Sequence, residues 1–404
     1  MSKVEYKNTL IKDIGRVVTG KTPETKKAEF YGNGYMFITP AELHDGYNVQ
    51  VSDKYITESG LQSIKSNCID GTSVMVGCIG WDMGNVAICH RKCATNQQIN
   101  SITDFNPKYN PFYTYYWLLT KKDYLFTIAS VTRTPILSKS TFEEIVIPMP
   151  DRSIQDNVVG ILKPIDDMIE NNKRICSELE AMAKTIYDYW FVQFDFPDEN
   201  GNPYRTSGGE MVWNEQLKRE IPKGWEVTNI GKITANFDSR RIPLSQNERN
   251  SMKGDIPYYG ATGVMDYVDQ FIFDGQYVLI AEDGSVVDGD GHPIVQMIWG
   301  KTWVNNHAHV LEGCNGYSNE LLYFVLKDIP VIKIMTGSIQ KKINQDNLNN
   351  YKIPQIPHEI ANQFTSILKT IFSKLRAIEI ENSELTKLRD WLLPMLMNGQ
   401  ARVE

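Results

Sequence analysis

The sequence has little of what an exported or membrane-embedded protein needs. Only six cysteines occur among the 404 residues, at scattered positions, which favours a reduced, cytoplasmic compartment over a disulfide-bonded, secreted protein. No run of about 18 apolar residues is present, so no membrane-spanning helix is expected. The opening residues, MSKVEYK, lack the apolar stretch of a signal peptide. These absences favour a globular protein that is neither exported nor held in a membrane.

Positive charge is also scarce. The 42 lysines and arginines are outnumbered by 49 aspartates and glutamates, so the net charge is −7 at pH 7. This balance argues against a protein that holds nucleic acid through its overall charge. A nucleic-acid surface would have to be local, or shared with a basic partner. The length predicts about two to four domains.

Motifs of catalysis and of metal binding are missing. No HExxH, GxSxG or Asn/Asp-Pro-Pro-Tyr/Phe methyltransferase motif occurs. His307 and His309 lack a second ligand pair at zinc-finger spacing, as do Cys89 and Cys93. The aspartates between positions 283 and 290 lack the spacing of a calcium loop. We therefore expect no metal, no cofactor and no catalytic residue.

One segment does match a nucleotide-binding motif. Residues 15–22, GRVVTGKT, fit the P-loop pattern letter for letter. A P-loop follows a buried strand and its lysine opens a helix, whereas here the approach is polar and Pro23 follows directly. A nucleotide-hydrolysing enzyme therefore stays as an alternative that the context disfavours. The same turn, with Lys21 and Thr22, is better suited to meet a DNA phosphate.

What the sequence does have is a long heptad pattern. From Ile154 to Tyr189, apolar residues recur at alternating steps of four and three, with Asn172 as the one polar member. An ordinary amphipathic core helix is the simpler interpretation, but so long a pattern favours a helix that pairs with another long helix. The pattern recurs in phase 206 residues later, from Ile360 to Met395, with polar breaks at Lys374 and Glu381. Residues expected at the helix–helix or partner interface are Ile161, Ile165, Met168, Asn172, Ile175, Leu179, Met182, Ile186, Ile367, Ile371, Lys374, Ile378, Glu381, Leu385, Leu388 and Leu392.

The segments before the helices repeat as well. Strand-like runs at 35–39, 72–79 and 85–89 are punctuated by Gly, Asn and Asp, and the run at 275–281 echoes the one at 71–77. The loop at 336–342 lies 206 residues after that at 130–136, and Ile-Pro precedes each long helix. We therefore expect a first domain at 1–150, a central helix at 151–194, a connector at 195–224, a second domain at 225–357 and a C-terminal helix at 358–404.

Chain connectivity predicts how these parts are arranged. The second domain is reached from the end of the first helix and feeds the start of the second, so the helices should run antiparallel. The fold class expected is α+β, with two α/β domains related by pseudo-twofold symmetry and separated by a long antiparallel two-helix coiled coil. Helices of this length would span ~55–60 Å and act as a spacer.

These features resemble the specificity (S) subunit of a Type I restriction-modification enzyme. The resemblance covers essentially the whole chain and includes GSIQKKINQDNL at 337–348, LRDWLLP at 388–394, YWFV at 189–192 and the connector motifs NGNPY and REIPKGW. One departure is Arg133-Thr134-Pro135, where the second half has the more typical Ile-Gln-Lys.

The resemblance implies a non-catalytic subunit that reads double-stranded DNA. Each globular domain would read one half of a split, asymmetric site, while the helices set the spacer and dock two methyltransferase (modification) subunits, which the restriction subunits join. A purely structural coiled-coil adaptor is the second alternative.

DNA contacts need Lys or Arg for phosphates and polar side chains for base edges. The candidates lie mostly in the repeated loops, and Trp81, in a Gly-flanked loop, could stack on or wedge between bases. They are Lys21, Thr22, Trp81, Thr132, Arg133, Thr134, Arg240, Arg241, His307, Ser338, Gln340, Lys341 and Lys342. Asn172 is expected to fix the register of the helices by pairing near Lys374 and Glu381.

Overall fold

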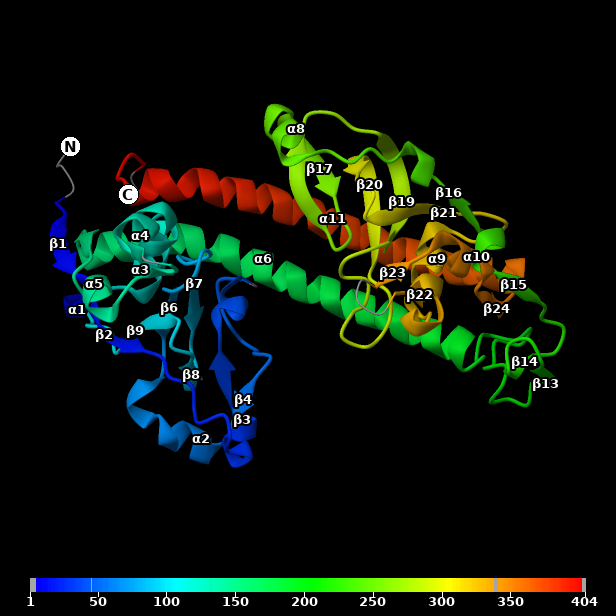
Figure 1. The fold of residues 1–404 in the computed structure, drawn as a ribbon, viewed down its shortest axis with the longest axis horizontal. Coiled ribbons are helices and arrows are strands. Elements are labelled where there is room, and N and C mark those ends of the chain that lie inside the picture. Colours follow the sequence, from blue (N-terminus) through cyan, green and yellow to red (C-terminus); the bar gives the residue numbers. More distant parts are fainter. Residues whose placement is uncertain (1–4, 45, 132, 338–340, 402–404) are drawn as a thin grey trace. The chain divides into compact units, whose positions relative to one another are not determined.

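The structure of the chain is a computed structural model, which describes residues 5–44, 46–131, 133–337 and 341–401. The chain forms two compact units. The first comprises Met1–Arg174 and Glu379–Glu404, and the second comprises Ile175–Ile378. Each unit contains one globular domain and a part of each long helix (Figure 1). The order of elements is the α+β arrangement that the internal repeat predicts.

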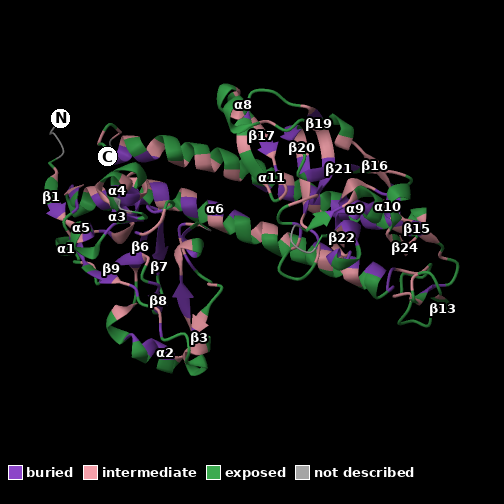
Figure 2. Ribbon diagram, in the orientation of Figure 1, coloured by how far each residue is buried: buried purple, intermediate pink, exposed green. Residues whose placement is uncertain are grey.

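The first globular domain is built on two four-stranded sheets, ordered β2-β9-β6-β7 and β4-β3-β8-β5. The central strand β6 is buried at every position (Figure 2). Its side chains alternate between two cores on opposite faces of the sheet. The elements are β1 (Lys7–Leu10), α1 (Ile11–Ile14), β2 (Arg16–Thr19), η1 (Ala28–Phe30), β3 (Tyr31–Ile38), η2 (Pro40–His44), β4 (Tyr55–Ile56), α2 (Glu58–Ser63), η3 (Lys65–Asn67), β5 (Cys68–Ile69), β6 (Ser73–Gly77), β7 (Val86–Cys89), β8 (Cys93–Thr95), β9 (Ile99–Thr103), α3 (Pro111–Leu119), α4 (Lys122–Ile128), β10 (Ser130–Val131), β11 (Pro135–Ile136), α5 (Lys139–Glu143) and β12 (Val146–Met149).

The second globular domain carries one six-stranded sheet, ordered β16-β21-β19-β20-β17-β18. The connector before it contains a hairpin of β13 (Met211–Asn214) and β14 (Arg219–Pro222). The remaining elements are β15 (Val227–Asn229), α7 (Ile230–Ile233), β16 (Thr234–Asn236), η5 (Asp238–Arg240), α8 (Gln246–Ser251), β17 (Lys253–Tyr259), β18 (Val264–Val268), β19 (Phe273–Ala281), β20 (Val295–Val304), β21 (Ala308–Gly313), α9 (Asn319–Lys327), η6 (Val331–Lys333), β22 (Met335–Thr336), β23 (Lys342–Ile343), α10 (Gln345–Asn350) and β24 (Lys352–Pro354).

The two domains repeat one strand order. Strands β2-β9-β6-β7 correspond to β16-β21-β19-β20, and the single long β20 takes the place of both β7 and β8. The pairings fix the residue correspondence: Gly77 lies opposite Ile99 in the first domain, and Ala281 lies opposite Ala308 in the second. Asn100 in β9 is therefore equivalent to His309 in β21.

The P-loop-like segment is part of this sheet. Residues Arg16–Thr19 form β2, which pairs with β9, and Val17 and Val18 are buried. Backbone amides engaged in a sheet cannot wrap a phosphate, so this segment does not have the geometry of a nucleotide-binding loop.

Each domain closes on itself before its long helix begins. Strand β1 pairs with β12, and β15 pairs with β24. The Ile-Pro segments before the helices are therefore strands, with Ile147 opposite Thr9 and Ile353 opposite Thr228.

The two long helices are α6 (Arg152–Tyr187, 36 residues), which continues as a π-helical turn η4 (Asp188–Val192), and α11 (His358–Met397, 40 residues). In the first unit they run antiparallel, because Asp166 contacts Arg389 while Asn172, further along α6, contacts the earlier Glu381 of α11. In the second unit Phe364 of α11 packs against the rings of Trp190 and Phe191, with centroids 5.3 and 4.8 Å apart.

The phase of the helical seam differs from the prediction. Met168, Met182, Ile367 and Leu388 were expected in the seam but are 46%, 57%, 37% and 44% exposed. The buried residues are the next ones along the chain, among them Ile169, Ala183 and Leu368. The reason is that each helix packs against a globular domain as well as against the other helix, so its buried face is wider than a coiled-coil stripe and is centred to one side of it. Of the other predicted positions, Asn172 and Ile378 are buried, Lys374 and Glu381 are exposed, and Ile161, Ile165, Ile175, Leu179, Ile186, Ile371, Leu385 and Leu392 are intermediate.

Candidate nucleic-acid interface

Three strands of the first domain have an end at the same edge of its central sheet. Strand β2 ends there at Thr19, opposite Asn100 near the start of β9, and β6 ends there at Gly77. The loops that leave this edge carry Lys21, Thr22 and Trp81. The sheet therefore brings together residues that are 60 positions apart in the sequence.

The hairpin β10–β11 joins the same edge. Gly80 donates its backbone N–H to the carbonyl of Pro135 (3.0 Å), and Leu137 donates to the carbonyl of Cys78 (2.8 Å). Arg133 and Thr134 follow Val131 in this hairpin and are exposed. Thr132 lies outside the described residues.

The side chains at this edge are open to solvent. Trp81 is 71% exposed and its ring lies 6.0 Å from that of Phe126, while Lys21 is exposed and Thr22 donates to Gln97 Oε1 at 2.8 Å. An exposed aromatic ring, together with an exposed lysine and an exposed arginine in other loops of the same edge, is a combination that can stack on a base and neutralise phosphates.

The second domain gathers its candidates at the equivalent edge. Strand β19 ends at Ala281 opposite Ala308, and the next two residues, Glu282 and Asp283, contact three of the predicted residues. Arg241 Nη1 lies 2.6 Å from Glu282 Oε2, and Lys342 Nζ lies 2.9 Å from Glu282 Oε1. His307 Nδ1 lies 2.5 Å from Asp283 Oδ1. Arg241, Lys342 and His307 therefore all contact the neighbouring acids Glu282 and Asp283.

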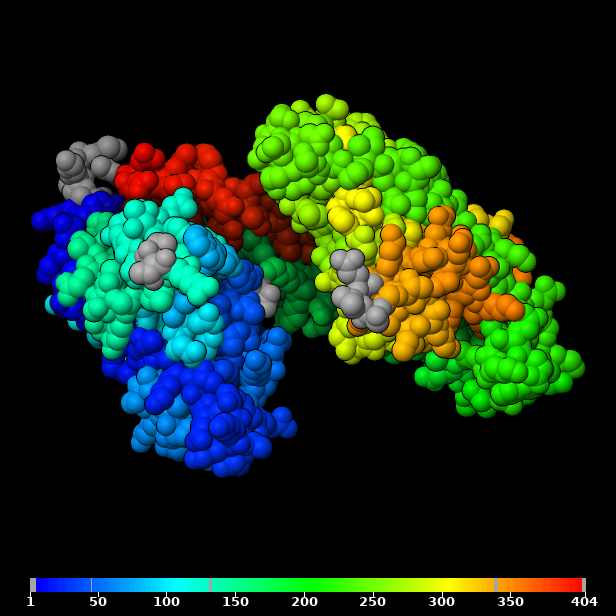
Figure 3. Space-filling view, viewed as in Figure 1, coloured from blue at the N-terminus to red at the C-terminus, as the bar shows by residue number. Residues whose placement is uncertain are grey.

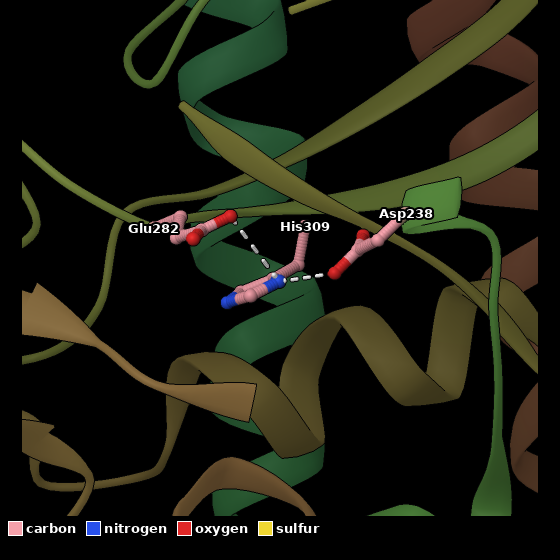
Figure 4. A group of neighbouring side chains, drawn as sticks. All are labelled: Asp238, Glu282 and His309. Carbon is pink, nitrogen blue, oxygen red and sulfur yellow. Dashed lines mark hydrogen bonds and ion pairs between the residues drawn. The ribbon is translucent and has the colours of Figure 1, made fainter. Parts of the chain in front are cut away.

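His309 lies at the centre of this cluster (Figure 4). Its Nδ1 is 2.5 Å from Asp238 Oδ2 and 3.6 Å from Glu282 Oε2, and its Nε2 is 3.0 Å from the carbonyl oxygen of Ile343. A carbonyl and a carboxylate can only accept hydrogen bonds, so both ring nitrogens must donate. The geometry therefore assigns His309 as a positively charged imidazolium.

The electrostatics of the cluster agree with that assignment. Burial lowers the pKa of His309, but the hydrogen bond and the charge of Asp238, together with the Ile343 carbonyl, outweigh it and raise the net pKa above its ordinary value. Burial likewise opposes ionisation of Glu282, yet Lys342 and Arg241 hold its pKa below the usual range. The pKa of Asp238 is also lowered, with His309 as the main favourable partner against burial.

The ligand atoms of Asp238, Glu282 and His309 lie within 4.8 Å of one another, which is close enough for a metal ion. Arg241 and Lys342 already pair with the carboxylate of Glu282, and both nitrogens of His309 are engaged. Three cationic side chains already face the two carboxylates, so the cluster is built as an ion-pair network.

Not every predicted residue belongs to this edge. The guanidinium of Arg240 lies 4.7 Å from the ring centroid of Phe273 and donates to the carbonyl of Ile272 at 2.6 Å. Phe273 begins β19 while Ala281 ends it, so Arg240 points to the opposite end of that strand. Lys341 is exposed beside Lys342, whereas Ser338 and Gln340 lie outside the described residues.

A second polar cluster joins three elements of the first unit. Asp166 of α6 is 2% exposed and accepts hydrogen bonds from the Tyr116 hydroxyl (2.7 Å) and from Arg389 Nη1 of α11 (3.1 Å). Asn172 Nδ2 donates to Glu381 Oε2 and to Asn382 Oδ1, each at 3.0 Å, which confirms the predicted pairing with Glu381. The expected proximity to Lys374 is not among the contacts of the described residues.

The C-terminal part of α11 in the first unit presents an open surface (Figure 3, red). Trp391 is 58% exposed and Leu388 is 44% exposed, and on α6 of the same unit Met168 is 46% exposed.

Sequence reasoning missed Asp238, Glu282, His309, Asn100 and Asp166. The His-Ala-His pattern drew attention to His309 only as a possible zinc ligand. At His309 and Asn100 the available signal was a polar residue at the second position of a strand.

Comparisons with known proteins agree with these features. The family described as "Type I restriction modification DNA specificity domain" matches residues 3–181 and 222–388. The chain is 28% identical over 418 residues to the specificity subunit of the Type I restriction enzyme MjaIX of Methanocaldococcus jannaschii, covering 98% of this chain and 93% of that protein.

The specificity subunit of the HindI enzyme of Haemophilus influenzae is 31% identical over 351 residues, covering 68% of this chain and 74% of that protein. The crystal structure of an S subunit from M. genitalium shares the fold, with a TM-score of 0.55, 16% identity and coverage of 98% and 97% of the two chains. Within the described residues, no helix is long and apolar enough to cross a membrane. With its family domain present twice, the chain belongs to the Type I restriction-modification DNA specificity family.

Proposed function

We propose that this chain reads DNA for a Type I restriction-modification complex, with each globular domain contacting one half of a split, asymmetric site on double-stranded DNA. The observation that carries the proposal is the gathering of candidate DNA-contacting residues at the same sheet edge in both domains. Membership in the specificity family supports it independently.

The candidate residues take different roles under this proposal. Lys21, Arg133 and Lys341 are exposed cations for phosphates or base edges, and Trp81 supplies an apolar ring. Arg241 is tied to Glu282 and to the backbone carbonyl of Ala308 (2.7 Å), so we assign it to shaping the surface. Because the cations of the second domain are largely balanced by acids, the isolated chain should bind DNA weakly.

The chain assembles with other subunits of a restriction-modification complex. We propose that two methyltransferase subunits dock on the long helices and that restriction subunits join them. Methyl transfer and cleavage would then reside in those partners, and the chain would work in the cytoplasm with them. We further propose that the lengths of α6 and α11 set the number of unspecified bases between the half-sites.

Methylome sequencing of a host that expresses this chain with its methyltransferase partner tests the proposal. A split motif should appear, and replacing residues 1–150 with the corresponding domain of another specificity subunit should change one half of it only. Loss of all methylation in a well-folded complex, or methylation without sequence preference, would favour the structural adaptor.

Matched lysine and arginine variants test the assigned edge. Lys21→Ala lies just beyond the end of β2, and the control Arg16→Ala lies at its start, in an exposed pair with Asp104. Binding of the complex to a duplex that carries the methylated motif should weaken for Lys21→Ala, with a salt dependence of log Kd smaller by about one phosphate contact. Arg16→Ala should bind as the unaltered protein does; equal losses in both variants would contradict the assignment.

A further inference from the structure

The two domains hold their edge hairpins through equivalent residues. In the first domain, Asn100 Nδ2 donates to the carbonyl of Leu137, which follows hairpin β10–β11, at 3.3 Å. In the second, His309 Nε2 donates to the carbonyl of Ile343, the last residue of hairpin β22–β23, at 3.0 Å. Asn100 and His309 occupy matching positions on β9 and β21. A backbone hydrogen bond is also equivalent in the two domains. The N–H of Leu137 donates to the carbonyl of Cys78, and the N–H of Ile343 donates to the carbonyl of Glu282, each at 2.8 Å.

Asn100 and His309 each anchor a hairpin through one hydrogen bond, and we call each of these contacts an anchor. The groups that contact the two anchoring side chains differ in charge. Asn100 is 2% exposed and accepts a hydrogen bond from the Thr19 hydroxyl at 2.6 Å, so the first anchor is made of neutral groups. His309, also 2% exposed, faces Asp238 at the start of η5 and Glu282 after β19. These carboxylates in turn pair with Arg241 and Lys342. The second anchor is therefore ionic.

We propose that Asn100 and His309 are equivalent positioning residues for the two recognition hairpins, and that the second hairpin, unlike the first, is held in a pH-dependent way. This inference rests on the proposed DNA-reading function for its consequence but not for its geometry. Neutral imidazole has a single N–H, so His309 cannot serve Asp238 and Ile343 together once it loses a proton. The bond to the ionised Asp238 is charge-assisted and is kept, and the bond to the Ile343 carbonyl is lost.

The direction of the pH effect follows from the environment of His309. Because its folded pKa is raised above the ordinary value, the anchor is complete below about pH 6.5 and is lost as the pH rises through the folded pKa. Asn100 does not titrate, and burial raises the pKa of the Cys78 thiol beside it to about 12, so the first anchor should not change between about pH 6 and about pH 9.

Hydrogen exchange of the purified full-length chain tests the anchor without DNA. The equivalent amides of Ile343 and Leu137 are compared as protection factors between about pH 6 and about pH 9. Protection of Ile343 should fall about tenfold across this range, and that of Leu137 should stay constant. A flat profile for Ile343, or a parallel fall at both amides, would overturn the inference.

Two variants separate positioning from simple support of the fold. His309→Asn gives the second domain the residue of the first and should make the Ile343 profile independent of pH. Asp238→Asn keeps the histidine but removes the carboxylate that favours its charged form, so the fall should move to lower pH. An unchanged midpoint in Asp238→Asn would refute the mechanism even if His309→Asn fails to fold.

Methylation by the complete complex then tests the consequence. Discrimination against mismatches in the half-site read by the second domain should weaken several-fold at high pH, while that of the first half-site should not. Selective methylation together with pH-independent amide protection rejects the anchor and leaves the proposed function standing. If the amides behave as expected but methylation is not selective, the anchor stands and the proposed function is rejected.

Discussion

The buried carboxylate of Asp166 ties together the globular domain and both long helices of the first unit, and its removal should be costly. Asp166→Ala deprives the Tyr116 hydroxyl, in a fully buried residue, and the Arg389 guanidinium of their shared acceptor. An unsatisfied buried hydroxyl costs about 1–3 kcal/mol. Losing one partner of a buried ion pair costs about 3–5 kcal/mol, but Arg389 still pairs with the exposed Asp390 at 2.8 Å. We therefore expect the first unit to lose about 3 kcal/mol.

The pH dependence provides a second signature of Asp166. Burial raises its pKa, and the hydrogen bonds from Tyr116 and Arg389 offset this only in part. A carboxyl group with a raised folded pKa binds protons more readily in the folded state, so stability falls as the pH rises from about 4 through the folded pKa. Asp166→Ala should lack this slope.

Native-state hydrogen exchange is the appropriate assay, because a chain with two compact units need not unfold in one step. Core amides of the first unit should lose protection while those of the second unit do not. In a double-mutant cycle, Tyr116→Phe should cost about 1 kcal/mol in the natural chain and almost nothing beside Asp166→Ala. Equal costs of Tyr116→Phe in the two backgrounds would refute the coupling.

Three further substitutions have definite expected outcomes. Asn172→Leu should raise the thermal midpoint yet permit slipped or self-associated helices, visible by light scattering; a monodisperse variant of unchanged midpoint would contradict the register role. Trp81→Ala should change stability by less than about 1 kcal/mol, because the ring is 71% exposed, while DNA binding by the complex weakens; unaltered binding would remove Trp81 from the interface. Gly20→Ala would place its Cβ 2.2 Å from the carbonyl oxygen of Asn96, so we expect a loss of about 1–3 kcal/mol in thermal unfolding and impaired reading of the first half-site, whereas a stable, fully selective variant would show that the loop can move freely.

The sequence was sufficient for the features that depend on periodicity. A heptad pattern and its recurrence predict two long helices, and the repeated strands predict two similar sheets. Because strand ends meet at a sheet edge, the candidate loops at 20–22, 81 and 130–136 could be expected to converge. The phase of the seam could not, since it depends on how each helix shares its buried face between two neighbours.

The structural roles of individual charged residues could not be predicted from the sequence. Arg241 has the composition expected of a DNA contact, but it is held by Glu282 and Asp238. Asp166 lies next to the predicted seam residue Ile165 and would ordinarily be placed on a solvated face, yet it is buried by Tyr116 and Arg389. A buried ion pair produces no periodic pattern in the sequence, because its two partners lie in elements that are distant along the chain and come together only in the fold.

The closure of each globular domain by its first and last strands has an evolutionary consequence. Since β1 pairs with β12 and β15 pairs with β24, a domain enters and leaves the rest of the chain at neighbouring points. Genetic recombination that exchanges the intervening segment needs to match those two adjacent junctions and also the helix side chains that complete the core of the domain, such as Val158 of α6 and Leu393 of α11. A domain can therefore be exchanged as one segment, provided that the faces of the long helices beneath it fit the incoming core.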